Sequence, residues 1–122
     1  MRALVIEDDA SIRRTLIHAL RRTFPGVNTI VAESADEAIA LLQESACEGP
    51  AFDLITSDFN LLGTRTGGDV LDWIQAHLSH LESRFVFVSG NDAIRLRGVP
   101  YLEKPFTFDD FRATVRSLVP NY

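Results

Sequence analysis

Four short apolar runs in this chain each end in polar residues that suit a phosphoryl-transfer site. The polar residues at the run ends include three acids, a hydroxyl and a lysine: Glu7, Asp8, Asp58, Ser89 and Lys104. If the runs are neighbouring parallel strands, their carboxyl ends meet at one edge of a sheet, where open α/β sheets bind ligands. An aspartate beside a metal and a lysine is suited to act as a nucleophile toward phosphorus. Asp58 is the centre of this predicted site.

Three carboxylates that lie close together repel one another unless a cation intervenes. Glu7, Asp8 and Asp58 together with Lys104 carry a formal charge of −2, from three acids and one lysine, which one divalent cation balances. Mg²⁺ prefers hard oxygen ligands and takes one or two protein carboxylates. The sequence therefore predicts a Mg²⁺ site, with Lys104 and the Ser89 hydroxyl contacting the transferred oxygens.

Each of these residues also has a structural interpretation. Acidic residues after a strand are often helix N-caps, and a Ser-Gly pair after a strand is often a turn. Their joint occurrence at four strand ends, in chain order, favours the functional interpretation.

The apolar periodicity that must position these residues alternates between strand-like and helix-like segments. Strands are predicted at 2–6, 27–32, 52–57, 84–88 and 99–102. Helices are predicted over 10–23, from Ser34 to before Gly49, from Thr66 with Leu78 and Leu81 on its buried face, and from Thr107 to Pro120. Ser34 and Glu37 have capping-box spacing. This alternation predicts one α/β domain over 1–122, with a parallel sheet and helices on both faces.

The predicted fourth helix is shortened or missing. Only eight residues separate Gly90 from Val99, whereas an average helix takes about 11–12 residues.

Composition excludes several classes of function. The chain has 122 residues, 46% of them hydrophobic, and a net charge of −5, which argues against nucleic-acid binding through a basic surface. No apolar stretch approaches the ~20 residues of a membrane-spanning helix. The N-terminal apolar run is too short for a signal peptide. A single cysteine, Cys47, excludes an internal disulfide and favours a cytoplasmic location.

The chain resembles the receiver domain of two-component response regulators along nearly its whole length. The residues that carry this resemblance are 4–9, 53–60, 87–90 and 101–106. The resemblance implies a flavodoxin-like, doubly wound sheet of strand order 2-1-3-4-5. It also implies that Asp58 accepts a phosphoryl group from a phosphohistidine of a histidine kinase or phosphotransfer protein. Such a domain signals to a downstream protein target and is not a turnover enzyme, although it catalyses its own phosphorylation and dephosphorylation.

The resemblance assigns a role to each matching residue. Asp8 and Asp58 bind Mg²⁺ directly, together with the backbone carbonyl of Asn60, whereas Glu7 acts through water. Asp9 falls one place later and starts the first helix. Ser89 and Lys104 contact the phosphoryl group. Tyr101 is the aromatic switch residue, whose ring moves inward when Ser89 engages the phosphate, and the Lys104-Pro105 bond is cis.

Three features depart from the family pattern. Leu62 replaces the usual proline, the loop from Asp58 to Gly68 is longer than usual, and the 90–98 segment is short. Because relatives use the helix in that segment for output, an alternative function is a phosphate-independent, receiver-like protein-binding module. The resemblance is compatible with a stand-alone regulator and with part of a hybrid kinase. No output domain is expected within these residues.

Other candidates are weaker. An aspartyl-phosphate phosphatase is disfavoured because Asn60 stands where a second carboxylate would serve as general acid. A flavin-binding flavodoxin is disfavoured because acids follow the first strand in place of a phosphate-binding loop. His77 and His80 are interpreted as a solvated face, with a shared metal as the weaker alternative, and His18 on the first helix is not interpreted as a phosphohistidine carrier. The arginines of that helix are interpreted as a solvated face, with part of a kinase-docking surface as the alternative: Arg13, Arg14, Arg21 and Arg22.

Overall fold

A five-stranded, all-parallel sheet of order β2-β1-β3-β4-β5 forms the centre of the molecule. The structure is a computed structural model that describes residues 1–61, 63–90 and 98–121. The strands are β1 (Arg2–Ile6), β2 (Asn28–Ala32), β3 (Leu54–Ser57), β4 (Phe85–Ser89) and β5 (Tyr101–Glu103). Their order confirms the predicted topology.

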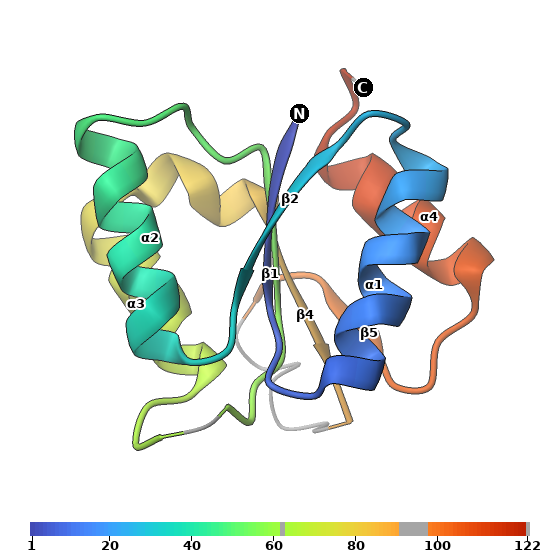
Figure 1. Cartoon of the computed structure of the whole chain (residues 1–122), viewed down its shortest axis with the longest axis horizontal. Helices are drawn as coiled ribbons and strands as arrows, with labels where there is room; N and C mark the ends of the chain where they lie inside the picture. The colour runs from blue at the N-terminus through green and yellow to red at the C-terminus, as the bar shows by residue number, and fades with distance from the viewer. Residues whose placement is uncertain (62, 91–97, 122) are drawn as a thin grey trace.

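Helices cover both faces of this sheet (Figure 1). α2 (Ala35–Cys47) and α3 (Gly67–His77) lie on one face, whereas α1 (Ala10–Thr23) and α4 (Phe108–Leu118) lie on the other. The 3-10 helix η1 (Ser79–Arg84) connects α3 to β4. Because successive side chains of a strand point to opposite faces, the strands β1, β3, β4 and β5 each contribute to two separate apolar cores, whereas β2 contributes only to the α2–α3 core. The α2–α3 core includes Leu4, Ile6, Ile55, Phe85 and Phe87, and the α1–α4 core includes Ala3, Val5, Leu54, Val88 and Leu102.

The bounds of several elements differ from the predicted ones, and two of these differences have a clear physical reason. α3 ends at His77 because Leu78 leaves the helical region with φ −136° and ψ 55°, and Leu81 reaches the same core from η1. β5 begins at Tyr101 and not at Val99. Pro100 has no N–H to donate to the ladder, although its carbonyl accepts from the Phe87 N–H at 3.0 Å.

A side-chain cap begins each of the four α-helices within the described residues. The residues at these N-caps are Asp9, Ser34, Thr66 and Thr107. The predicted capping box at Ser34 is only half formed, because the Glu37 carboxylate accepts from the N–H of Glu33 and not from that of Ser34. Thr66 and Asp69 form a complete box. The predictions for Leu62 and for the shortened fourth helix concern positions 62 and 91–97, which lie outside the described residues.

Candidate functional site

The strand register brings the predicted site residues to one edge of the sheet. Ile6 lies opposite Ser57, and Ser89 lies opposite Glu103. The ladder continues one residue further, because the Asp58 N–H donates to Ile6 O at 3.0 Å and the Lys104 N–H donates to Ser89 O at 3.1 Å. Glu7, Asp58, Ser89 and Lys104 therefore share this edge, as the sequence predicted.

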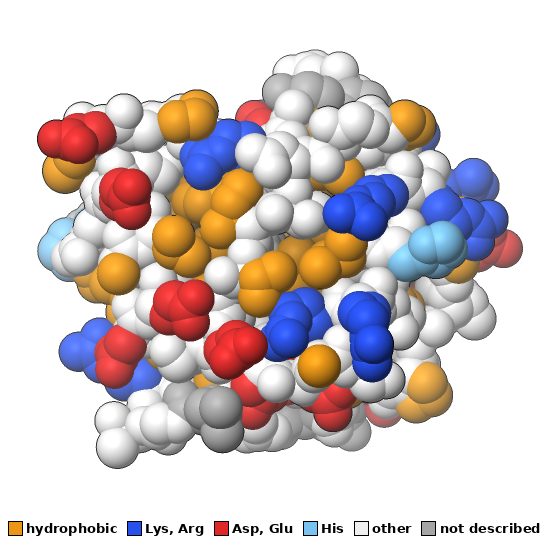
Figure 2. Space-filling model, in the orientation of Figure 1, with side chains coloured by type: hydrophobic (Ala, Val, Ile, Leu, Met, Phe, Trp, Pro, Cys, Tyr) orange, Lys and Arg blue, Asp and Glu red, His pale blue; other side chains and the backbone are white. Residues whose placement is uncertain are grey.

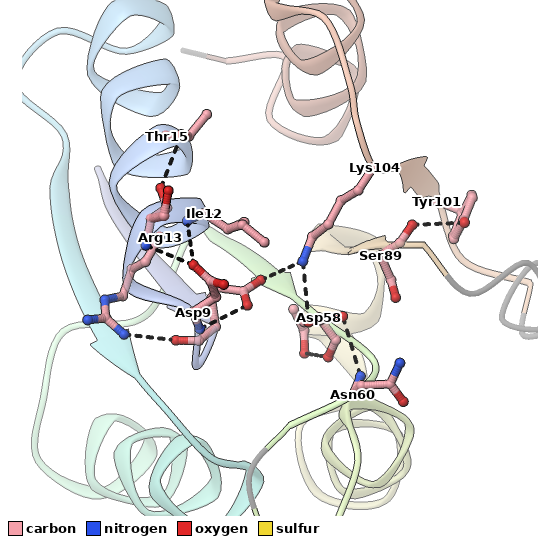
Figure 3. A network of polar contacts seen from close by, with 12 residues as sticks. Asp9, Ile12, Arg13, Thr15, Asp58, Asn60, Ser89, Tyr101 and Lys104 are labelled. Carbon is pink, nitrogen blue, oxygen red and sulfur yellow. Dashed lines mark hydrogen bonds and ion pairs between the residues drawn. The ribbon is translucent and has the colours of Figure 1, made fainter.

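Lys104 bridges two of the acids. Its Nζ lies 2.8 Å from Glu7 Oε2 and 3.3 Å from Asp58 Oδ2 (Figure 3). Burial alone would lower the pKa of the Lys104 ammonium, but its contacts with Glu7 and Asp58 outweigh burial and raise that pKa above its ordinary value of 10.5. The lysine is therefore held as a cation between the two carboxylates. Its peptide bond to Pro105 is cis.

Every polar group of Glu7 has a partner. The side chain is only 1% exposed. Its Oε1 accepts from the Asp9 N–H at 3.2 Å and its Oε2 from Lys104. Its backbone N–H donates to Ala32 O at 3.0 Å, and its carbonyl accepts from Arg13 Nη1 at 3.1 Å. Burial raises the pKa of the Glu7 carboxyl above 4.5, because it outweighs the opposing hydrogen bond from Lys104, and the nearby Asp58 charge adds to the increase.

The Asp58 loop is packed closely against the start of α3. The Ser57 hydroxyl donates to the Asp58 carbonyl at 2.8 Å, and the Asn60 N–H donates to Asp58 Oδ1 at 3.3 Å. A Cβ at Gly67 would lie 2.1 Å from the Asp58 carbonyl oxygen. Position 67 must therefore be glycine for α3 to begin this close to the loop. The sequence predicted only that a helix begins at Thr66 and gave no signal for this close approach.

Carboxylate oxygens of Glu7, Asp8 and Asp58 lie within 4.8 Å of one another. This spacing and the oxygen-only donor set fit a hard divalent cation such as Mg²⁺. Asp9 instead caps the N-terminus of α1, because its Oδ1 accepts hydrogen bonds from the N–H groups of Ser11 and Ile12 at 2.8 and 3.1 Å. The structure thus separates the acids that could bind metal from the acid that caps α1.

Ser89 and Tyr101 meet at the far side of the site. Ser89 is 1% exposed, and the Tyr101 hydroxyl donates to its backbone carbonyl at 2.9 Å (Figure 3). A change of the Tyr101 side chain to another χ1 rotamer would carry the hydroxyl away from this carbonyl and break the bond. The ring is therefore tied to the end of the strand that also bears the Ser89 hydroxyl.

The arginines of α1 do not form one uniform solvated face. In Figure 2, Lys and Arg side chains gather over the α1 side, whereas Asp and Glu lie mainly over the α2 side and the lower edge. Arg14, Arg21 and Arg22 are exposed. Arg13 is an exception to the predicted solvated face, since its side chain is 20% exposed and contacts Glu33 as well as Glu7. Helical periodicity alone gave no signal for this contact, which depends on the turn before α1.

A surface groove of about 340 Å³ adjoins Lys104. It runs between the first turns of α1 and the segment after β5, and it is lined by Ser11, Ile12, Thr15, Lys104, Pro105 and Phe106.

His77 lies at the C-terminal end of α3, and its ring packs on that of Trp73 with the two centroids 4.7 Å apart. That contact gives His77 a packing role away from the acidic site.

The chain matches the sequence profile of the response regulator receiver domain over residues 3–116. It belongs to this family. A comparison with curated proteins gives no match. No helix among the described residues of this receiver domain is both long enough and apolar enough to cross a membrane.

Solved structures support the same fold for the receiver domain. The non-phosphorylated HemR receiver domain of Leptospira biflexa is 26% identical, with a TM-score of 0.77 and coverage of 97% of this chain and 94% of that one. Response regulator TrrA of Thermotoga maritima, in complex with Mg²⁺ and BeF, is 22% identical, with a TM-score of 0.78 and coverage of 97% and 98%. A sensor protein from Polaromonas sp. JS666 is 22% identical, with a TM-score of 0.79 and coverage of 98% and 96%.

Proposed function

We propose that this receiver domain accepts a phosphoryl group on Asp58 from a phosphohistidine of a histidine kinase or histidine phosphotransfer protein. The observation that carries the proposal is the position of Lys104 Nζ, which lies 3.3 Å from the Asp58 carboxylate and 2.8 Å from that of Glu7. An ammonium group beside a carboxylate nucleophile can neutralise the oxygens of an incoming phosphoryl group. The domain would act in a two-component phosphorelay.

The reaction transfers the phosphoryl group between two side chains. An Asp58 carboxylate oxygen attacks phosphorus, the phosphorus–nitrogen bond breaks, and the donor imidazole leaves with the electron pair. Lys104 and the Ser89 hydroxyl contact the phosphoryl oxygens. Attack of water on phosphorus later restores the carboxylate and releases inorganic phosphate. The domain therefore catalyses its own phosphorylation and hydrolysis without turning over a separate substrate.

Mg²⁺ is the cofactor that we assign to the acidic cluster. When bound, it would neutralise charge shared by the carboxylates and the phosphoryl oxygens. Asp8, Asp58 and the carbonyl of Asn60 would hold it directly. Both Glu7 oxygens already accept hydrogen bonds, which favours a contact through water. The Mg²⁺–BeF complex of TrrA supports this choice of ion.

The switch that we assign is the pair formed by Ser89 and Tyr101. The Tyr101 hydroxyl donates a hydrogen bond to the Ser89 carbonyl. A contact between the Ser89 hydroxyl and the phosphate would therefore change the structure directly beside the Tyr101 ring. A changed ring position would then be read by a downstream protein.

The groove beside Lys104 is the approach that we assign to the phosphohistidine protein. It opens next to the Lys104 side chain, and its lining combines small hydroxyl residues with apolar ones, including Thr15 and Phe106. We place the domain in the cytoplasm. Its free, exposed Cys47 is compatible with a reducing compartment.

Labelling by a radioactive acyl phosphate tests the proposal. Wild-type protein should incorporate label with Mg²⁺ and lose this ability in EDTA, and Asp58→Asn should take up none. Asp53→Asn is the matched control, because Asp53 precedes the same strand at its other end and bonds to the Arg2 N–H. Persistent labelling of Asp58→Asn would overturn the assignment.

A structural readout complements labelling. Beryllofluoride with Mg²⁺ should shift the amide NMR signals of Ser89 and Tyr101 in the wild type and leave them in place in Asp58→Asn. Unchanged wild-type signals would instead favour a phosphate-independent binding module.

A further inference from the structure

Arg13 points back toward the turn after β1, although it belongs to α1 (Figure 3). Its Nη1 donates to the backbone carbonyl of Glu7 at 3.1 Å and lies 3.3 Å from Glu33 Oε1. The Arg13 side chain is 20% exposed and that of Glu33 is 55% exposed. The neighbouring Arg14 is exposed to solvent. One guanidinium nitrogen therefore connects α1, the turn after β1 and the turn after β2.

The contact to Glu7 controls the backbone that leads to Asp8. The Glu7 N–H is fixed by Ala32 O, and the Glu7 carbonyl is fixed by Arg13. Because a peptide group is planar, holding that carbonyl also orients the N–H of Asp8 and fixes the direction in which the chain enters this residue. The Asp8 carboxylate belongs to the group of oxygens within 4.8 Å of one another.

We infer that Arg13 is a positioning residue for the metal site. It acts through the Glu7 carbonyl to hold Asp8 in place, and Glu33 holds the Arg13 guanidinium in turn. This inference rests on the proposed function, because Mg²⁺ is the ion that the positioned carboxylates would bind.

Electrostatics and positioning predict opposite effects of removing Arg13. Loss of a positive charge near three carboxylates should by itself strengthen Mg²⁺ binding. Loss of the hydrogen bond that orients Asp8 should weaken it, by about tenfold if Arg13 resembles other residues that support metal ligands. The direction of the change therefore identifies the role.

The experiment measures Mg²⁺ affinity of the whole chain from amide NMR shifts of Asp8 and Asp9. Arg13→Met should bind Mg²⁺ about tenfold more weakly than wild type. Arg14→Met is the matched control, because it changes the net charge equally from the next position of the same helix, and its affinity should be equal or slightly higher. Saturating Mg²⁺ should restore Asp58 labelling in Arg13→Met, which damage elsewhere in the fold would not allow.

Arg13→Lys keeps the charge and tests geometry alone, so it also serves if Arg13→Met does not fold. Its shorter side chain should weaken Mg²⁺ binding relative to Arg14→Lys. Equal or tighter binding in Arg13→Met, or in Arg13→Lys where only that variant folds, would overturn the positioning role while leaving the proposed function intact. Failure of the wild type to bind Mg²⁺ would overturn the metal site and the positioning role together.

Discussion

At the scale of single residues, one lysine must balance more than one acid. Lys104 contacts two carboxylates within 3.3 Å, so attraction outweighs the burial of its own charge. Glu7 has the opposite balance, because it is almost completely buried and shares that lysine with Asp58. The pKa values of both groups are therefore raised, although the two groups bear opposite charges.

The raised pKa of Glu7 makes stability depend on pH. Because the folded chain holds this proton more tightly than the unfolded chain, stability falls as pH rises from 4.5 through the raised value. Urea unfolding without Mg²⁺ should show the wild type losing stability relative to Glu7→Gln across this interval. A difference between the two proteins that does not change with pH would contradict the prediction. Lys104 causes a separate loss of stability at alkaline pH. Its stabilising contribution is complete below pH 10.5 and is lost as the pH rises through its raised pKa.

Thr56 carries a hydroxyl that folding buries. It is 1% exposed, and its Oγ1 has no hydrogen-bond partner among the described residues. Thr56→Val keeps the shape and removes the unsatisfied oxygen, so we expect stability to stay equal or increase by about 1 kcal/mol. Thr56→Ser is the control, because it keeps the hydroxyl and loses a methyl group worth about 0.8 kcal/mol. Clear destabilisation by Thr56→Val in urea unfolding would reveal a partner for this hydroxyl.

At the scale of elements, adjacent acids after β1 have separate tasks. Asp9 caps α1 through Ser11 and Ile12, whereas Asp8 joins the acidic cluster. Asp9→Ala should cost about 1 kcal/mol of stability and leave Mg²⁺ affinity close to the wild-type value, and Asp9→Ser should recover most of the stability. Asp8→Asn should instead lose Mg²⁺ binding while the helix stays intact. Loss of Mg²⁺ binding in Asp9→Ser, measured by NMR, would reverse these assignments.

The close packing of the Asp58 loop against α3 depends on a glycine, Gly67, at the start of this helix. A Cβ at Gly67 would meet the Asp58 carbonyl at 2.1 Å and Ser57 Oγ at 2.8 Å. Gly67→Ala must displace the loop or the helix, and such overpacking costs about 1–3 kcal/mol. Acyl phosphate labelling of Asp58 should slow as well. Gly90→Ala is the control for stability, because a Cβ there has no atom of the described residues within 4 Å. Equal stability of the two variants would exclude a tight junction.

At the scale of the whole molecule, the sequence predicted where the site lies but only some of the contacts that hold it in place. Residue types after the apolar runs placed Asp58 and Lys104 at one sheet edge, because parallel strands end together. The contact of Arg13 with Glu7 was not predictable from helical periodicity, since it depends on how the preceding turn folds back. The close approach at Gly67 depends on tertiary packing. Local patterns therefore predicted which polar groups meet at this edge, and long-range geometry determined what holds them.

The proposed Mg²⁺ site at the acidic edge predicts that metal binding stabilises the whole domain. A ligand that binds only the folded state adds about 2.7 kcal/mol to the free energy of unfolding at 100 times its Kd. We expect this increase with MgCl₂ in urea unfolding of the wild type, measured against KCl of equal ionic strength because screening alone also relieves repulsion. Asp8→Asn removes one of the three clustered carboxylates, so it should gain no more stability from MgCl₂ than from KCl. Its metal-free form should be at least as stable as the wild type, because less repulsion remains. Equal gains from MgCl₂ in both proteins would place the ion elsewhere on a surface whose net charge is −5.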